Sequence, residues 1–502
     1  MARAYSYAYA GSTTPLIGLT IPDYLDRIAE THPDNEALID VPSGRRWTYK
    51  EFTRDCRRVA RAFMAMGLER GDRVGIWATN HPEWVLVQFG SAIAGIVLVN
   101  INPAYRTHEL EYALKNSGAR ALLLVERFKT SDYVSMVYQI APKAREAKAG
   151  SIDSENLPLL RSLVLIGESA HPGMYTWQEF MELADSVDDA SRAERQGALD
   201  IDDVINIQYT SGTTGLPKGA SLTHHNILNN GFFAGEGMRL SEKDRLCIPV
   251  PFYHCFGMVL ANLACVTHGA SMVIPAESFD ARSTLVAVEQ ERCTALHGVP
   301  TMFIAELEHP EFESFNLTSL RTGIMAGAPC PIEVMRKVVD RMHASQMTIA
   351  YGETEASPIA TQTPVDATLE DRTGTVGLPT PHVELKIIDS ETGAIVPCGT
   401  QGEICYRGYN IMRGYHNNPE GTAEAIDTAK WLHSGDLATM DERGYCKITG
   451  RVKEMIIRGG ENVYPREIEE FLFSHPKIRN VQVIGVPDEK YGEEIQAWIE
   501  LR

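Results

Sequence analysis

The sequence lacks any apolar run long enough to cross a membrane, and its first residues lack the short apolar stretch of a secretory signal. Basic residues are also in deficit, because 47 lysines and arginines face 66 aspartates and glutamates and the formal net charge is -19. Nucleic-acid backbones bind to basic surfaces, so this balance argues against a nucleic-acid partner. We therefore expect a cytoplasmic protein with no transmembrane segment.

Paired cysteines are missing as well. The nine cysteines, an odd number, are scattered from Cys56 to Cys446 and form neither a CxxC pair nor a spacing typical of metal ligands. This pattern does not fit a disulfide framework. It indicates reduced, mostly buried thiols in a reducing compartment.

What is present is the composition of a globular protein, with 44% apolar and 23% charged residues. A chain of 502 residues is too long for one hydrophobic core, so we expect two or more domains or lobes. Apolar periodicity predicts helices over 49–67, 82–95 and 108–118 and strands over 72–78, 96–102 and 119–125. Helices that alternate with buried strands indicate an α/β fold with parallel sheets covered on both faces.

The pattern changes at about Gly377. From there the chain has short strands with turn signals, as in "HVELKIIDSETGAIVPCGTQGEICYRG" and "GYCKITG". We expect a smaller β-rich lobe here, followed by a tail of strand and helix.

The segment "YTSGTTGLPKG", residues 209–219, concentrates hydroxyls, glycines and one lysine. Its glycines can turn backbone N–H groups inward, and its hydroxyls and the Lys218 ammonium can bind the oxygens of a polyphosphate. A strand is predicted before it and a helix after it. The segment lacks the GxxxxGK[ST] pattern of a Walker A loop. Taken alone, it could equally be a flexible surface loop.

Seven motifs in order make the sequence resemble the adenylate-forming superfamily of acyl-CoA synthetases, luciferases and peptide-synthetase adenylation domains. They are "TSGTTGLPKG" (210–219), "YHCFG" (253–257), "GAP" (327–329), "YGETE" (351–355), "TVGLP" (375–379), "HSGDLATMDERGY" (433–445) and "GRVKEMIIRGGENVYPREIE" (450–469). Their wording looks most like that of medium-chain fatty acyl-CoA synthetases. The resemblance implies that a carboxylic (fatty) acid reacts with ATP to give an acyl-adenylate and pyrophosphate. Coenzyme A then takes the acyl group and releases AMP.

The resemblance also implies roles for individual residues. A phosphate-binding loop would contain Thr210, Ser211, Gly212, Thr213, Thr214, Gly215 and Lys218. Adenine would lie against Gly327, Ala328 and Pro329 and near Tyr351 and Gly352. Thr354 would contact the α-phosphate and Glu355 would bind Mg²⁺, a cation that prefers oxygen ligands. Without the motif, Tyr351 and Glu355 would be an ordinary core aromatic and a solvated carboxylate.

Further residues match the family's motifs towards the C-terminus. Asp436 would accept both ribose hydroxyls, Arg451 would reach the nucleotide, and Lys453 would lie at a hinge; Gly459 and Gly460 would form part of the CoA tunnel. The alternatives are a turn aspartate for Asp436 and a surface lysine for Lys453.

Two features concern the acid. His254 in "PFYHCFG" would position the substrate rather than act as a base, although an isolated histidine in an apolar run is more often a core residue. Glu353 stands where the family usually has an apolar residue. The acyl tunnel would be lined by Phe252, Phe256, Met258, Val299, Pro300, Met302 and Phe303, each of which could equally fill the core.

By the same resemblance we expect an N-terminal AMP-binding domain over 1–449, made of two parallel or mixed sheets with flanking helices and a β-rich subdomain over 377–449. A partial α+β C-terminal domain would occupy 450–502. We find no match to the lysine that the family carries near its C-terminus, and we expect a truncated chain that adenylates poorly. A homodimer is also among the expected states.

Two other functions fit the same motifs. An adenylation enzyme could load its acyl group onto a carrier protein, whose pantetheine arm would use the CoA tunnel. A truncated chain could also bind nucleotide or acyl group without turnover.

Overall fold

The computed structural model describes residues 3–210, 216–454, 456–458, 461–463, 465–473, 475, 477–488 and 492–501. Most of the described chain forms two large sheets. The first has the order β10-β9-β6-β4-β5-β11-β12-β22 and is parallel from β10 to β11. Its strands are β4 (Arg73–Trp77), β5 (Val97–Asn100), β6 (Ala121–Val125), β9 (Ser162–Ile166), β10 (Tyr175–Thr176), β11 (Val204–Thr210), β12 (Lys218–Thr223) and β22 (Gly414–Tyr415).

The second large sheet has the order β19-β18-β17-β16-β15-β13-β14-β2-β3 and is parallel from β17 to β2. Its strands are β2 (Glu36–Asp40), β3 (Arg45–Thr48), β13 (Arg245–Cys247), β14 (Ser271–Ile274), β15 (Ala295–Leu296), β16 (Thr322–Ala326), β17 (Gln346–Gly352), β18 (Ile359–Gln362) and β19 (Leu378–Pro379).

The smaller sheets belong mainly to the C-terminal part. An antiparallel sheet of order β1-β20-β21-β23-β24 contains β1 (Tyr7–Tyr9), β20 (Val383–Ile388), β21 (Gly402–Gly408), β23 (Leu432–Met440) and β24 (Cys446–Arg451). A further sheet of order β26-β25-β28-β27 contains β25 (Ile456–Arg458), β26 (Glu461–Val463), β27 (Ile478–Asp488) and β28 (Gly492–Leu501). A short ribbon pairs β7 (Arg127–Phe128) with β8 (Ser131–Asp132).

Helices connect these strands. The α-helices are α1 (Ile21–Thr31), α2 (Tyr49–Ala65), α3 (Pro82–Ala94), α4 (Thr107–Ser117), α5 (Tyr133–Ile140), α6 (Trp177–Leu183), α7 (Asp189–Gly197), α8 (His224–Gly237), α9 (Cys255–Gly257), α10 (Ala264–His268), α11 (Ala281–Gln290), α12 (Pro300–Leu307), α13 (Ile332–Arg341), α14 (Leu369–Gly374), α15 (Pro419–Ala425) and α16 (Pro465–Phe473). Short 3-10 helices are η1 (Pro142–Arg145), η2 (Ala184–Ser186), η4 (Phe312–Ser314), η5 (Thr354–Ala356) and η6 (Val452–Glu454), and η3 (Met258–Leu263) is a π-helix.

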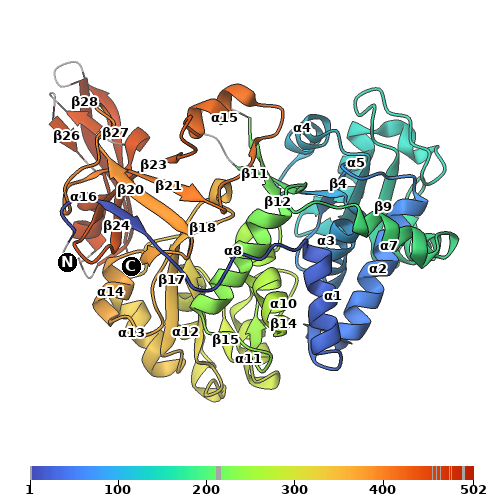
Figure 1. The fold of residues 1–502 in the computed structure, drawn as a ribbon, viewed down its shortest axis with the longest axis horizontal. Helices are drawn as coiled ribbons and strands as arrows, with labels where there is room; N and C mark the ends of the chain where they lie inside the picture. The colour runs from blue at the N-terminus through green and yellow to red at the C-terminus, as the bar shows by residue number, and fades with distance from the viewer. Residues whose placement is uncertain are drawn as a thin grey trace.

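Figure 1 shows α8 at the middle of the molecule, and it contacts both large sheets through β12 and β18. The strands β26, β27 and β28 lie at the opposite end of the molecule from α1 and α2. The predicted α/β fold, with two mixed sheets, a β-rich part and a C-terminal α+β portion, is confirmed. The domain boundaries at 377 and 449 stay predictions. Among the described residues, no helix is long and apolar enough to span a bilayer.

The predicted helix over 49–67 forms for local reasons. Thr48 and Glu51 make a reciprocal capping box at its start. Phe52, Cys56 and Val59 recur at helical spacing and are fully buried, so one face of α2 packs into the core. The prediction that most cysteines are buried is also confirmed, because all of them except Cys398 are buried.

The helix predicted after the glycine-rich loop forms as α8, but a short strand before it was not predicted. Lys218–Thr223 forms strand β12, which pairs antiparallel with β11. All of its residues from 219 to 223 are buried, because β12 is an inner strand with β11 on one side and β22 on the other. The loop therefore closes a hairpin, and α8 begins only at His224.

Glu306 of α12 gives a testable consequence for stability. Its carboxyl is buried, Oε2 has no hydrogen-bond partner among the described residues, and burial raises its pKa well above 4.5. Because the folded pKa exceeds the unfolded one, stability is greatest below the unfolded pKa and falls as pH rises towards the folded pKa, by about 1.4 kcal/mol per pH unit. We expect Glu306→Met to raise the melting temperature, and to raise it more at pH 8 than at pH 5.

The control for this change is Glu308→Met, because Glu308 is exposed on the same helix end. Thermal unfolding at both pH values would measure the difference. A Glu306→Met protein that melts no higher than the wild type at pH 8 would contradict the expectation.

Candidate active site

Glu355, in η5, is the centre of a cluster of hydroxyl groups. It is only 8% exposed, and its Oε1 accepts a hydrogen bond from the Thr210 hydroxyl at 3.0 Å and one from the Tyr415 hydroxyl at 2.8 Å. Thr210 ends β11 and Tyr415 ends β22, so three separate segments meet at one carboxylate. The three oxygen-bearing side chains form a donor set suited to a hard cation such as Mg²⁺.

Lys218 brings a positive charge to the same place. Its Nζ lies 5.1 Å from the centre of the Tyr415 ring, and its backbone pairs with that of Thr210 across the hairpin. An ammonium over an aromatic face is attracted by the ring's quadrupole. The hairpin ends therefore present a hydroxyl and a cation beside Glu355.

Asp436 of β23 has both carboxylate oxygens engaged. Oδ2 accepts from the Tyr351 hydroxyl at 2.7 Å, and Oδ1 accepts from Arg451 Nε at 3.1 Å. The aspartate is 16% exposed while Arg451 is 61% exposed, so the arginine can leave at little cost. A ligand with two hydroxyls can then replace these donors on a bidentate acceptor.

Glu353 is linked to Asp436 through two tyrosines. Its Oε1 accepts from the Tyr406 hydroxyl at 3.3 Å, and Tyr406 in turn lies 3.2 Å from the Tyr351 hydroxyl. Burial raises the pKa of Glu353 well above its usual value, and the charges of Glu355 and Asp436 raise the pKa further. Both effects favour the protonated, uncharged form of Glu353.

The backbone around this cluster needs glycine at two positions. Gly352 has φ 157°, and a Cβ there would lie 1.9 Å from the carbonyl oxygen of Pro358. Gly327 has φ 84°, a value that favours glycine, and it precedes Ala328 and Pro329, which are exposed. Because β16 and β17 are parallel neighbours, the segments after Ala326 and at Tyr351 come together at the carboxyl end of the sheet, where ligands bind in open α/β folds.

His254 lies at the start of α9 with its ring 4.0 Å from that of Tyr253. The side chain is exposed, yet the surrounding protein partly desolvates it and lowers its pKa. Of the residues expected to line an acyl tunnel, Phe252 and Phe303 are fully buried and Phe252 packs on Trp84, so they fill the core. Phe256 and Met302 are only partly buried and remain available to a ligand.

Several predicted residues cannot be placed. The loop residues Ser211, Gly212, Thr213, Thr214 and Gly215 lie outside the described residues, as do Gly459 and Gly460. Lys453 falls within η6, but its side chain is outside the description. Thr354 opens η5 and is partly buried beside Glu355.

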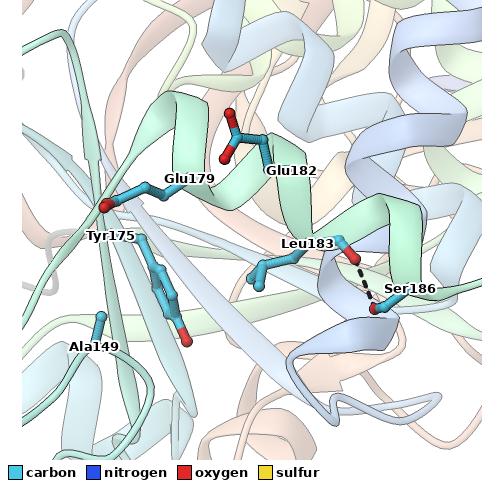
Figure 2. Close-up of a pocket in the computed structure, with 6 residues that line it drawn as sticks. All are labelled: Ala149, Tyr175, Glu179, Glu182, Leu183 and Ser186. Atoms are coloured by element: carbon cyan, nitrogen blue, oxygen red, sulfur yellow. Dashed lines mark hydrogen bonds between the residues drawn. The ribbon is translucent and has the colours of Figure 1, made fainter.

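A separate pocket of about 370 Å³ lies far along the first sheet and is lined by Tyr175, Glu179, Glu182 and neighbours (Figure 2). Three of its polar side chains already have hydrogen-bond partners within the fold. Glu179 caps α6 with Thr176, Glu182 accepts from Gln178, and the Ser186 hydroxyl donates to the Leu183 carbonyl. None of the predicted site residues lines it.

Comparison with known proteins shows which family the chain belongs to. The sequence profile described as AMP-binding enzyme matches residues 25–416. The chain belongs to the AMP-binding enzyme family. A Bacillus subtilis (strain 168) protein, YngI, described as an acyl-CoA synthetase, is 51% identical over 487 residues, covering 97% of this chain and 88% of that protein. The mitochondrial medium-chain acyl-CoA ligase ACSF2 of Danio rerio is 45% identical over 500 residues, covering 99% and 82%.

Among solved structures, the anthranilate CoA ligase AuaEII in complex with anthranoyl-AMP superposes with a TM-score of 0.83 at 26% identity, covering 97% of this chain and 88% of that one. As a member of the AMP-binding enzyme family, the chain is an AMP-forming acid–thiol ligase of the acyl-CoA synthetase kind and binds adenine nucleotides.

Two tyrosines of this AMP-binding enzyme were not predicted as site residues from the sequence. Tyr415, which donates to Glu355, and Tyr406, which joins Glu353 to Tyr351, come from short strands far away in sequence. No local pattern marks a tyrosine in "GYHN" or "CYRG" as part of a site, because its role depends on strand pairing across long separations.

Proposed function

We propose that this ligase activates a medium-chain fatty acid with ATP through an acyl-adenylate and then transfers the acyl group to coenzyme A. The observation that carries the proposal is the convergence of Thr210, Glu355 and Asp436, from three distant motifs, on two neighbouring groups of hydrogen-bonded side chains. Thr210 bonds directly to Glu355, and Glu353 lies within electrostatic reach of both Glu355 and Asp436.

In this proposal the protein acts by positioning and by balancing charge. A carboxylate is a poor leaving group, whereas AMP leaves readily, so the first half-reaction needs the acid oxygen held in line with the α-phosphorus. Thr354 and Lys218 would bind the phosphate oxygens, with the loop 211–215 completing the set. Asp436 and Tyr351 would orient the nucleoside, and His254 would face the acid.

Glu355, with the Thr210 and Tyr415 hydroxyls around it, would hold Mg²⁺. That ion supplies neutralisation of the phosphate charge, which helps the pyrophosphate to leave. The fit rests on the donor set, because the Thr210 and Tyr415 hydroxyl oxygens each lie at hydrogen-bond distance from Oε1 of Glu355. Gly459 and Gly460 would contribute to the path by which the CoA thiol reaches the adenylate.

The medium-chain part of the proposal is supported by the medium-chain ligases among the relatives and by the partly buried Phe256 and Met302. Each buried methylene contributes about 0.8 kcal/mol, or about fourfold in kcat/KM. We expect kcat/KM to rise by about this factor per methylene from acetate to about octanoate and then to level or fall. CoA-dependent AMP release over C2 to C16 and aryl acids measures it. A maximum at acetate or at an aryl acid would refute the medium-chain proposal but not the ligase class.

The carrier-protein alternative is separated by the acceptor. Release of AMP with octanoate and free CoA at a rate equal to or above that with a holo-carrier protein supports the proposal. Turnover with the holo-carrier protein but not with free CoA would favour the carrier-protein function instead of the CoA ligase.

A further inference from the structure

A cluster of Glu403, Cys405 and His433 lies on strands β21 and β23, in residues to which no role has been given. These three side chains have ligand atoms within 4.8 Å of one another, which is close enough to bind one metal ion. Among the residues that the structure describes, no other group of three acidic, thiol or imidazole side chains lies this close together. His433 Nδ1 is 3.0 Å from Glu403 Oε2 and 3.6 Å from Cys405 Sγ. Cys405 and His433 face each other as cross-strand partners of β21 and β23.

These separations match the edges of a tetrahedron around zinc. With Zn–N and Zn–O bonds of about 2.0–2.2 Å and Zn–S of about 2.3 Å, tetrahedral angles place N and O about 3.4 Å apart and N and S about 3.6 Å apart. The measured 3.6 Å for nitrogen to sulfur agrees, and the 3.0 Å for nitrogen to oxygen, now a hydrogen bond, needs only a small opening.

Asp427 supplies the second feature of such a site. Its Oδ2 lies 3.7 Å from the other ring nitrogen of His433, Nε2. Histidine ligands usually direct their second nitrogen towards a carboxylate, which fixes the tautomer and strengthens the donor atom. The site is also sheltered, because the Glu403 side chain is 14% exposed, that of His433 is 29% exposed and Cys405 is fully buried against Trp431.

We propose that Glu403, Cys405 and His433 bind one Zn²⁺ ion, with water as the fourth ligand. As the Zn–S bond forms, the Cys405 thiol releases its proton to solvent, and the His433 proton moves to Nε2, towards Asp427. The ion would hold β21 and β23 together. It would also help to position the segment that contains Asp436, because Glu403 Oε1 accepts the N–H of the preceding residue, Gly435, at 3.0 Å. The linear sequence gives no sign of this site, since 28 positions separate its cysteine from its histidine.

The test uses the full chain, freed of metal by a chelator and titrated with Co²⁺ and then Zn²⁺. Cobalt bound by a thiolate gives a near-ultraviolet sulfur-to-metal charge-transfer band. We expect this band to saturate at one ion per chain and to vanish when Zn²⁺ displaces Co²⁺. We also expect Zn²⁺ to raise the melting temperature.

Two variants and a control decide the assignment. Cys405→Ser should abolish the band, and His433→Gln, which keeps an amide able to bond Glu403, should keep it but weaken zinc binding at least about 10-fold. Cys398→Ser, outside the cluster, should bind like the wild type. A wild type without the band, or a band unchanged in Cys405→Ser, overturns the proposal. If Cys405→Ser fails to fold, unchanged zinc affinity in His433→Gln overturns it equally.

Discussion

Replacing Glu355 by glutamine is expected to lower the rate of adenylate formation by about 10²–10³-fold. The change keeps the size of the side chain and one oxygen that can accept from Thr210 or Tyr415. It removes the negative charge that would attract Mg²⁺, so the metal and the phosphates that it neutralises lose their anchor. ATP–pyrophosphate exchange over a range of Mg²⁺ concentrations measures the effect, and higher Mg²⁺ should restore part of the rate.

Glu353→Gln is the matched control, because the same substitution lies two residues away. Burial raises the pKa of Glu353, which favours the uncharged acid, so glutamine is expected to change the local charge less at this position than at Glu355. We expect the ATP–pyrophosphate exchange rate of Glu353→Gln to stay within about threefold of the wild-type rate. That corresponds to less free energy than a shift of one pKa unit, about 1.4 kcal/mol. Equal losses in both variants would show that Glu355 contributes as a packing group rather than as a charge.

Local periodicity was enough to predict much of the fold. The helix at 49–67 could be predicted because its capping box and its buried stripe, Phe52 to Val59, both lie within one segment. The strand Lys218–Thr223 could not, because it is short, follows a glycine-rich loop and is stabilised by pairing with β11 and β22. Such pairing depends on partners up to two hundred residues away, which no local window contains.

The candidate site divides in the same way. Thr210, Glu355 and Asp436 were found because family motifs mark them, and their mutual approach then follows from the sheet topology. The tyrosines 351, 406 and 415 organise the carboxylates through their hydroxyls, but this depends on side-chain geometry. The sequence indicated only that Tyr351 would lie near adenine and that Glu353 adds a carboxylate. The burial that raises the pKa of Glu353 depends on the fold and could not be predicted from the motif.

Changing Asp436 to asparagine is expected to raise the KM for ATP by about 10- to 150-fold while changing kcat less. A hydrogen bond to a charged acceptor is worth about 1.5–3 kcal/mol, and asparagine offers one accepting oxygen in place of two. The ion pair with Arg451 is also lost, although that residue is 61% exposed and the loss there costs little. Equilibrium binding of ATP, measured beside steady-state kinetics, separates affinity from turnover.

The partner variant is Tyr351→Phe, which removes the hydroxyl that donates to Asp436 Oδ2 at 2.7 Å and keeps the ring. Because the tyrosine's bond holds the carboxylate in place, the two changes should not add: the double variant should bind ATP about 0.5–3 kcal/mol better than the sum of the single losses predicts. Additive losses would mean that Tyr351 acts on adenine independently of Asp436. An unchanged KM for ATP in Asp436→Asn would mean that Asp436 does not bind the ribose hydroxyls. The affinity for ATP would then have to come from contacts to the phosphates.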